Sequence, residues 1–102
     1  MEIKYKHNGS NVIAQIHGEL DECSAVKAKS ILDQIINDNL YCNSFIFDLS
    51  ELTFMDSTGI GLLIGRYKKL KQNGIPAYIS GASIAAEKVI ELAGLYKIMP
   101  KC

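Results

Sequence analysis

The segment FMDSTGIG, residues 54–61, places a serine hydroxyl, Ser57, directly after a carboxylate, Asp56. A glycine-punctuated apolar run follows, so the pair stands where a helix is expected to begin. A serine in this position can act as a nucleophile, cap the helix, or serve as a residue that another protein modifies. Each role requires different residues around Ser57.

A nucleophilic serine needs a general base, normally histidine, and an oxyanion hole. Only His7 and His17 are available, and both lie in the N-terminal segment. The first glycine of a nucleophile elbow, G-x-S-x-G, is replaced here by Met55. Thr58 interrupts the Asp-Ser-Gly of aspartic proteases, and the chain has no phosphate-binding loop motif. We therefore predict that the protein is not an enzyme.

Asp56 and Ser57 are both suitable helix caps, because either side chain can accept bonds from the free N–H groups of the first turn. A helical wheel predicts a buried stripe of Ile60, Leu63, Ile64, Tyr67 and Leu70, and an opposite side of Thr58, Gly61, Leu62, Gly65, Lys69 and Gln72. Gly61 and Gly65 each cost a helix about 1 kcal/mol relative to alanine, and no core requires small residues there. A smooth strip beside an outward Leu62 indicates a face on which another backbone docks.

Composition fits one globular domain, residues 1–102. The formal net charge is zero, so we expect no nucleic-acid or membrane partner, and the basic run at residues 66–72 is interpreted as a solvated helix face. No apolar signal region or membrane-length segment is present, which favours the cytoplasm. Three widely spaced cysteines favour free thiols, and neither a metal site nor a cofactor is predicted.

The N-terminal half predicts a hairpin, a helix and a strand. Alternation in EIKYK and NVIAQIHGEL, residues 2–6 and 11–20, indicates two antiparallel strands joined at Asn8-Gly9. From Asp21 the spacing of the apolar residues changes to that of an amphipathic helix, with Asp21 or Ser24 as its cap. SFIFDL, residues 44–49, is apolar on both faces, as is usual for a central strand covered on both sides.

The C-terminal half continues the alternation. A helix is expected from Ser57 to about Asn73, then a strand at residues 76–80, and then a helix at residues 84–93 capped by Ser83. LYKIMP, residues 95–100, is predicted to form a last strand. The order β-β-α-β-α-β-α-β predicts an α/β fold with a mixed, mainly parallel sheet, an N-terminal antiparallel hairpin and helices packed on it.

Four segments together resemble the single-domain STAS proteins: GELD, FIFDLSEL, FMDSTGIGLLIGRYKKLK and LAGLYKI, at residues 18–21, 45–52, 54–71 and 92–98. D-S-T-G alone is a weak signal, but here it follows the central strand in register and precedes G-x-x-x-G-R-Y-K. The likeness runs from Met1 to about Pro100. It is greatest to the anti-sigma factor antagonists of spore-forming bacteria, particularly those that act on the sporulation anti-sigma F factor. In one departure, the further C-terminal helix usual in the family is missing from this sequence.

The resemblance implies the STAS fold and a binding protein switched by phosphorylation. The serine after the motif aspartate, which corresponds to Ser57, is phosphorylated in such antagonists by the anti-sigma factor, a serine kinase. The unphosphorylated antagonist binds that kinase and frees its sigma factor, and a serine phosphatase restores it. The aspartate ending G-E-L-D, here Asp21, helps to dock the kinase. The expected partner-binding residues are Asp21, Asp56, Ser57, Thr58, Gly59, Gly61, Leu62 and Gly65.

The physics of a helix start agrees with such a switch. A phosphoserine carries about −1.5 to −2 charges, and the free N–H groups of a helix N-terminus favour it. We therefore expect phosphorylation to weaken binding of the partner and to leave this domain folded. We also expect the domain to be monomeric. The alternative is an accessory STAS subunit of a bacterial lipid-transport ATPase, on which no kinase acts.

Overall fold

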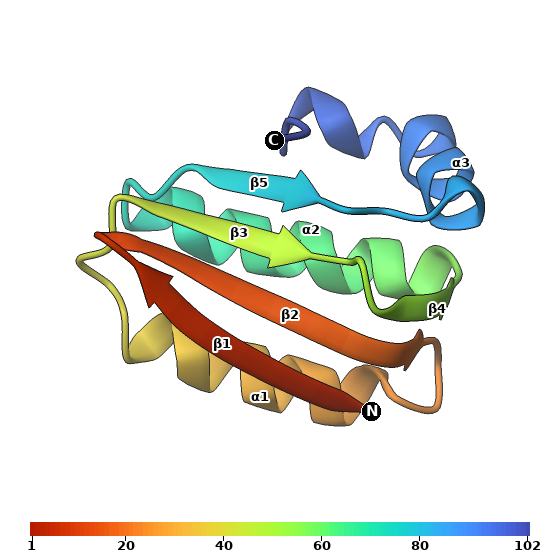
Figure 1. Ribbon diagram of the computed structural model, residues 1–102, viewed down its shortest axis with the longest axis horizontal. Helices are drawn as coiled ribbons and strands as arrows, with labels where there is room; N and C mark the ends of the chain where they lie inside the picture. The colour runs from red at the N-terminus through yellow and green to blue at the C-terminus, as the bar shows by residue number, and fades with distance from the viewer.

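The computed structural model describes residues 1–102 and contains one mixed, five-stranded sheet (Figure 1). Its strands are β1 (Glu2–Asn8), β2 (Asn11–Leu20), β3 (Ser44–Asp48), β4 (Leu52–Met55) and β5 (Ala77–Ser80). β1 is antiparallel to β2, whereas β2, β3 and β5 are parallel neighbours in that order. β4 pairs in parallel with the far end of β2. The predicted mixed α/β sheet with an antiparallel N-terminal hairpin is confirmed.

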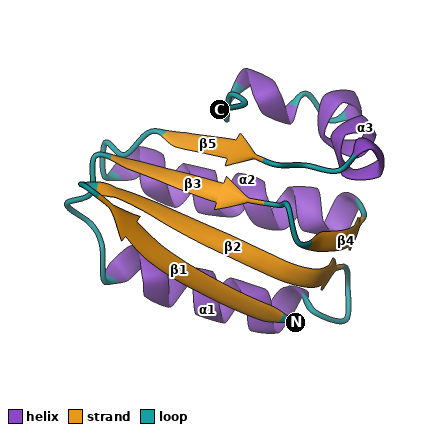
Figure 2. Cartoon of the chain, viewed as in Figure 1, coloured by secondary structure: helices purple, strands orange, loops and turns teal.

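Two long helices, α1 (Ala25–Asn37) and α2 (Ser57–Gln72), lie in contact on one face of the sheet (Figures 1 and 2). The crossovers β2-α1-β3 and β3-α2-β5 step in the same direction across the sheet, and right-handed crossovers then place both helices on the same side. α3 (Ile84–Leu92) packs against β4 and α2, and the 3₁₀ helix η1 (Leu95–Lys97) follows. No helix combines the length and apolarity needed to cross a membrane.

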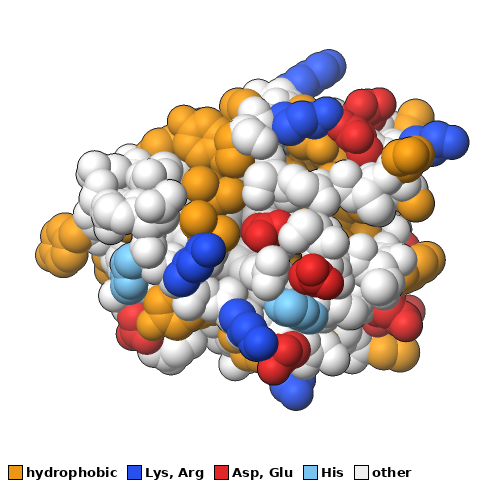
Figure 3. All heavy atoms as spheres, viewed as in Figure 1, with side chains coloured by type: hydrophobic (Ala, Val, Ile, Leu, Met, Phe, Trp, Pro, Cys, Tyr) orange, Lys and Arg blue, Asp and Glu red, His pale blue; other side chains and the backbone are white.

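The sheet face opposite the helices is open. Buried Phe45 and Phe47 of β3 point to the helix side, whereas Ile46 between them is only half-buried. Charged and histidine side chains are spread over the open face (Figure 3). The prediction that β3 is covered on both sides is therefore wrong, because both crossovers place their helices on the same face.

The predicted last strand, LYKIMP, is wrong. Residues Leu95–Lys97 form η1, and the N–H of Met99 donates to the carbonyl of Leu95. Leu95 and Met99 are both buried, whereas Lys97, which a strand would place on the same face, is exposed; this is the pattern of a helical turn. The chain joins the sheet just afterwards, through a single parallel bridge between Lys101 and Ile79.

Two smaller differences concern strands and turns. β4 was not predicted, because Leu52 and Met55 are buried while Thr53 and Phe54 are exposed, which breaks the alternation of a strand. In the hairpin, Asn8 pairs with Asn11, so the turn is Gly9-Ser10 and not Asn8-Gly9. Gly9 supplies the positive φ, +64°, that the tight turn needs.

Candidate functional site

α2 begins at Ser57 because Asp56 caps it. Asp56 has an extended backbone, and its Oδ1 accepts hydrogen bonds from the N–H groups of Thr58 at 2.9 Å and Gly59 at 3.4 Å. Of the two caps that the sequence allowed, the structure uses the aspartate. Ser57 is the first residue of the helix, its side chain is exposed, and its hydroxyl makes no hydrogen bond within the chain.

α1 begins differently, through a reciprocal pair. Oδ1 of Asp21 accepts from the N–H of Ser24 at 3.0 Å, and Oγ of Ser24 accepts from the N–H of Asp21 at 3.0 Å. The Ser24 hydroxyl also donates to the carbonyl of Glu19 at 2.7 Å. The bond from the Ser24 N–H stabilises the carboxylate and holds the pKa of Asp21 below its usual value. Ser24 is the N-cap residue of α1, but no side chain makes a capping hydrogen bond to this helix, so the predicted side-chain cap is not formed. The pair instead fixes the turn that precedes α1.

The two helix starts are neighbours because β2 and β4 are paired. Leu20 pairs with Met55, so Asp21 and Asp56 follow directly from paired residues. Gly59 allows α2 to approach the end of β2 closely: a Cβ on Gly59 would lie 2.7 Å from Met55 Cγ and 2.9 Å from the Leu20 carbonyl oxygen. The tertiary structure thus brings Asp21 and Ser57 to the same end of the molecule.

Two predicted contact residues are buried. Gly59 faces β2 and β4, and Leu62, predicted to point outward, is only 9% exposed. The cause is a second buried flank of α2, which faces α1 and carries Leu62, Arg66 and Lys69 at spacings of four and three. Lys69 was likewise placed on the outward side, but its Nζ lies 3.7 Å from Oδ1 of Asp33 on α1.

The outward flank of α2 keeps the small residues that the sequence singled out. A Cβ built on Gly61 or Gly65 would meet nothing within 4 Å, so neither glycine is required by the packing of this domain. Ser57, Gly61 and Gly65 follow one another at intervals of four and so share a helix face. We call these three residues the docking strip. Thr58 is exposed beside it.

Phe54 was missed as a candidate contact residue. It lies on β4, three residues before Ser57, and is 51% exposed. Ile84, the first residue of α3, is 80% exposed, and α3 packs against β4. Recognition of β4 as a strand with an outward aromatic would have identified Phe54. Nothing in the sequence pattern placed α3 beside it.

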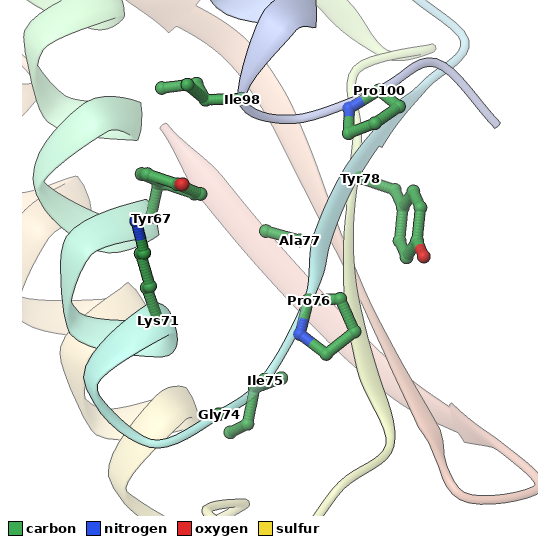
Figure 4. A pocket seen from close by; sticks show the side chains of 9 residues that line it. All are labelled: Tyr67, Lys71, Gly74, Ile75, Pro76, Ala77, Tyr78, Ile98 and Pro100. Atoms are coloured by element: carbon green, nitrogen blue, oxygen red, sulfur yellow. The ribbon is translucent and has the colours of Figure 1, made fainter.

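Neither histidine is hydrogen-bonded to Ser57. His7 Nε2 lies 2.7 Å from Asn39 Oδ1, and His17 Nε2 lies 2.8 Å from Gln15 Oε1. The three cysteines are unpaired, and no group of three or more metal-ligating side chains comes together. A hollow of about 380 Å³ lies between the C-terminal half of α2, β5 and the end of the chain, lined by residues such as Tyr67, Ala77 and Ile98 (Figure 4). No predicted site residue lines it.

The arrangement is that of a small α/β domain that offers a serine at the start of a helix. Residues 2–102 match the STAS domain, and the chain belongs to the STAS family. It is 30% identical over 100 residues to the anti-sigma F factor antagonist of Paenibacillus polymyxa, which covers 98% of this chain and 85% of the relative. It is 33% identical over 88 residues to an anti-sigma-B factor antagonist of Staphylococcus aureus, which covers 83% of this chain and 77% of the relative.

Solved structures show the same fold. The anti-sigma factor antagonist SpoIIAA in its unphosphorylated form superposes with a TM-score of 0.80 at 24% identity, over 99% of this chain and 88% of that one. The phosphorylated form of SpoIIAA, from Bacillus, gives a TM-score of 0.71 at 24% identity, over 99% and 91%. An anti-sigma factor antagonist from Mycobacterium paratuberculosis gives 0.86 at 22% identity, over 98% and 83%.

Proposed function

We propose that this chain is an anti-sigma factor antagonist that is switched by phosphorylation of Ser57. When Ser57 is unmodified, the chain binds an anti-sigma factor that is a serine kinase, and the kinase releases its sigma factor. Phosphorylation by that kinase ends the interaction, and a serine phosphatase reverses it. The observation that carries the proposal is the exposed and unbonded Ser57 hydroxyl at the start of α2, in a chain related to anti-sigma factor antagonists.

The surface around Ser57 suits a protein partner. The docking strip has no side chain beyond Cβ except the serine hydroxyl, so another backbone can approach it closely. Asp21 lies at the neighbouring helix start, half-buried and held in place by Ser24. A fixed carboxylate beside a smooth strip favours a partner that presents a cationic group next to its own backbone. Thr58, Asp56 and exposed Phe54 extend this surface.

Phosphorylation is proposed to act at the interface. Asp56 already occupies the N–H groups of Thr58 and Gly59, and the positive end of the helix dipole tolerates a further anion. An added phosphate therefore leaves the fold in place, in keeping with SpoIIAA, which matches this chain along 99% of its length in both forms. Pressed into a close interface, the same phosphate must be desolvated and lies beside the negative charge of Asp56.

We further infer that the chain has no catalytic activity of its own and works in the cytoplasm, without nucleic acid. Ser57 lacks a histidine partner, since both histidines are hydrogen-bonded on β1 and β2. Hydrolysis of a generic ester or of ATP by the purified protein, lost in Ser57→Ala, would overturn the inference on catalysis.

The deciding experiment is incubation with the cognate kinase and ATP, followed by intact mass and site mapping. We expect one added phosphoryl group, located on Ser57, with no modification of Ser57→Ala. Ser30→Ala is the matched control and should be phosphorylated like the wild type, because it removes an exposed hydroxyl from α1 and leaves the turn of Asp21 and Ser24 intact. Absence of phosphorylation would favour a role as an accessory subunit of a lipid-transport ATPase.

A further inference from the structure

The flank of α2 that faces α1 carries the single buried charged residue of the chain, Arg66, which is 8% exposed. Its Nε lies 2.9 Å from Oδ1 of Asp33 on α1, and Nζ of Lys69 lies 3.7 Å from the same oxygen. Neither the Asp33 Oδ1 nor the Arg66 Nε makes an aligned hydrogen bond, so the contact is an ion pair. One carboxylate of α1 is thus held by two cations of α2.

Stability alone is a poor explanation for this group. The desolvation of largely buried charges offsets much of their attraction, and apolar residues of similar volume often stabilise a protein as well or better. The three charges instead restrain how α2 is rotated and how it is positioned along its axis relative to α1. Arg66 and Lys69 are three residues apart on one flank, so a rotation of α2, or a slide by one turn of about 5.4 Å, separates at least one of them from Asp33. Apolar packing also restrains α2, but these ion pairs tie two particular side chains of α2 to one carboxylate of α1.

The rotation of α2 determines which residues face outward. Gly65 directly precedes Arg66, about 100° away around the helix axis, so the direction of the Arg66 side chain fixes the direction of the docking strip. α1, which carries Asp33, begins directly after the turn of Asp21 and Ser24. The ion pair therefore connects the helix that presents the strip to the helix that follows Asp21.

We propose that Asp33, Arg66 and Lys69 form a clamp that orients the docking strip relative to Asp21, and that they are positioning residues for recognition by the kinase. The proposal rests on the function proposed above. It predicts that loss of the clamp impairs recognition more than it impairs folding.

The test is the double variant Asp33→Leu/Arg66→Met, which removes both charges and keeps apolar volume. We expect its melting temperature to equal or exceed that of the wild type. The KM for phosphorylation of Ser57 by the cognate kinase should rise at least tenfold with little change in kcat. The amide chemical shifts of Gly61 and Gly65 should also move, because the strip turns. Lys71→Gln, which removes an exposed cation from the last turn of α2, is the matched control and should change none of these values.

A KM like that of the wild type, together with unchanged shifts at Gly61 and Gly65, would overturn the proposal. If the double variant does not fold, Arg66→Lys serves instead: it keeps the charge but loses the planar fork of arginine, so an intermediate rise in KM is expected and an unchanged KM refutes the clamp. If the kinase does not modify the wild-type chain, the proposed function fails, while the shifts of Gly61 and Gly65 still test the clamp.

Discussion

The two helices that meet at the candidate site begin with the same residue types and use them in opposite ways. At α1, Asp21 and Ser24 are three residues apart, so each side chain reaches the backbone N–H of the other, and the serine hydroxyl is fully engaged. At α2, Asp56 and Ser57 are adjacent. The aspartate alone caps the helix, and the serine, at its first position, points to solvent. The spacing of the pair decides whether its serine holds the backbone or remains available to another protein.

The largest expected effect is a loss of kinase binding, which tests whether Ser57 at the start of α2 is a docking residue. Ser57→Asp places a charge on the docking strip, so we expect kinase binding to weaken about thirtyfold or more, which is about 2 kcal/mol, with little change in melting temperature. Gly61→Glu should behave similarly, because it faces open space on the same strip. The measurement is calorimetry with the kinase and a melting curve for each variant.

Leu63→Asp provides the contrast for this prediction. Leu63 is fully buried, whereas Ile64, its neighbour in the predicted stripe, is only half-buried, so a charge at position 63 should unfold the domain. If Ser57→Asp and Gly61→Glu bind the kinase as tightly as the wild type, the docking strip is misplaced.

The second prediction compares Gly59, which packs against the ends of β2 and β4, with Gly61 of the docking strip. Gly59→Ala forces a Cβ to within 2.9 Å of the Leu20 carbonyl oxygen and should destabilise the domain by about 1–3 kcal/mol. Gly61→Ala meets no neighbour and should stabilise it by up to about 1 kcal/mol through helix propensity. Denaturant unfolding of both variants measures the difference. Equal stabilities would show that α2 does not rest on the end of β2.

The third prediction exchanges the two serines for alanine. Ser24→Ala loses the acceptor for the Asp21 N–H and the donor to the Glu19 carbonyl, so the free energy of unfolding should fall by about 1 kcal/mol. Ser57→Ala loses no internal bond and should stay within about 0.5 kcal/mol of the wild type. Chemical denaturation at neutral pH measures both. A larger loss for Ser57→Ala would reverse the roles assigned to the two helix starts.

The smallest expected effect is a pH dependence confined to the α1 start. The N–H of Ser24 lowers the pKa of Asp21 below its ordinary 3.8 in the folded state. The stability that this carboxylate contributes is therefore present above the unfolded-state value and lost as the pH falls through the folded-state pKa. The difference in unfolding free energy between the wild type and Asp21→Asn should be constant near neutral pH and shrink below 3.8. A difference that persists in stronger acid would contradict this assignment.

Much of this protein follows from its sequence alone. The spacing of apolar residues and the positions of turn and capping residues predicted the hairpin, β3, β5 and all three helices. Alternation, helical spacing and capping are properties of neighbouring residues, so a sequence displays them directly. The start of α2 at Asp56 and Ser57 was located for the same reason, because a capping side chain, here that of Asp56, bonds only to the next few N–H groups. Gly74 and Gly94 directly follow the predicted ends of two helices, and both have the left-handed backbone typical of a helix C-terminus, with φ of +70° and +71°.

Only the tertiary structure decided which neighbour each face meets. The pattern of α2 predicted one buried stripe against a sheet, but the helix packs against α1 as well, which buries Leu62 and pairs Arg66 with Asp33. β4, with no alternation, forms because the far end of β2 offers it a partner. A local pattern records how many faces of a segment are apolar, but contacts between segments far apart in the chain determine what covers each face.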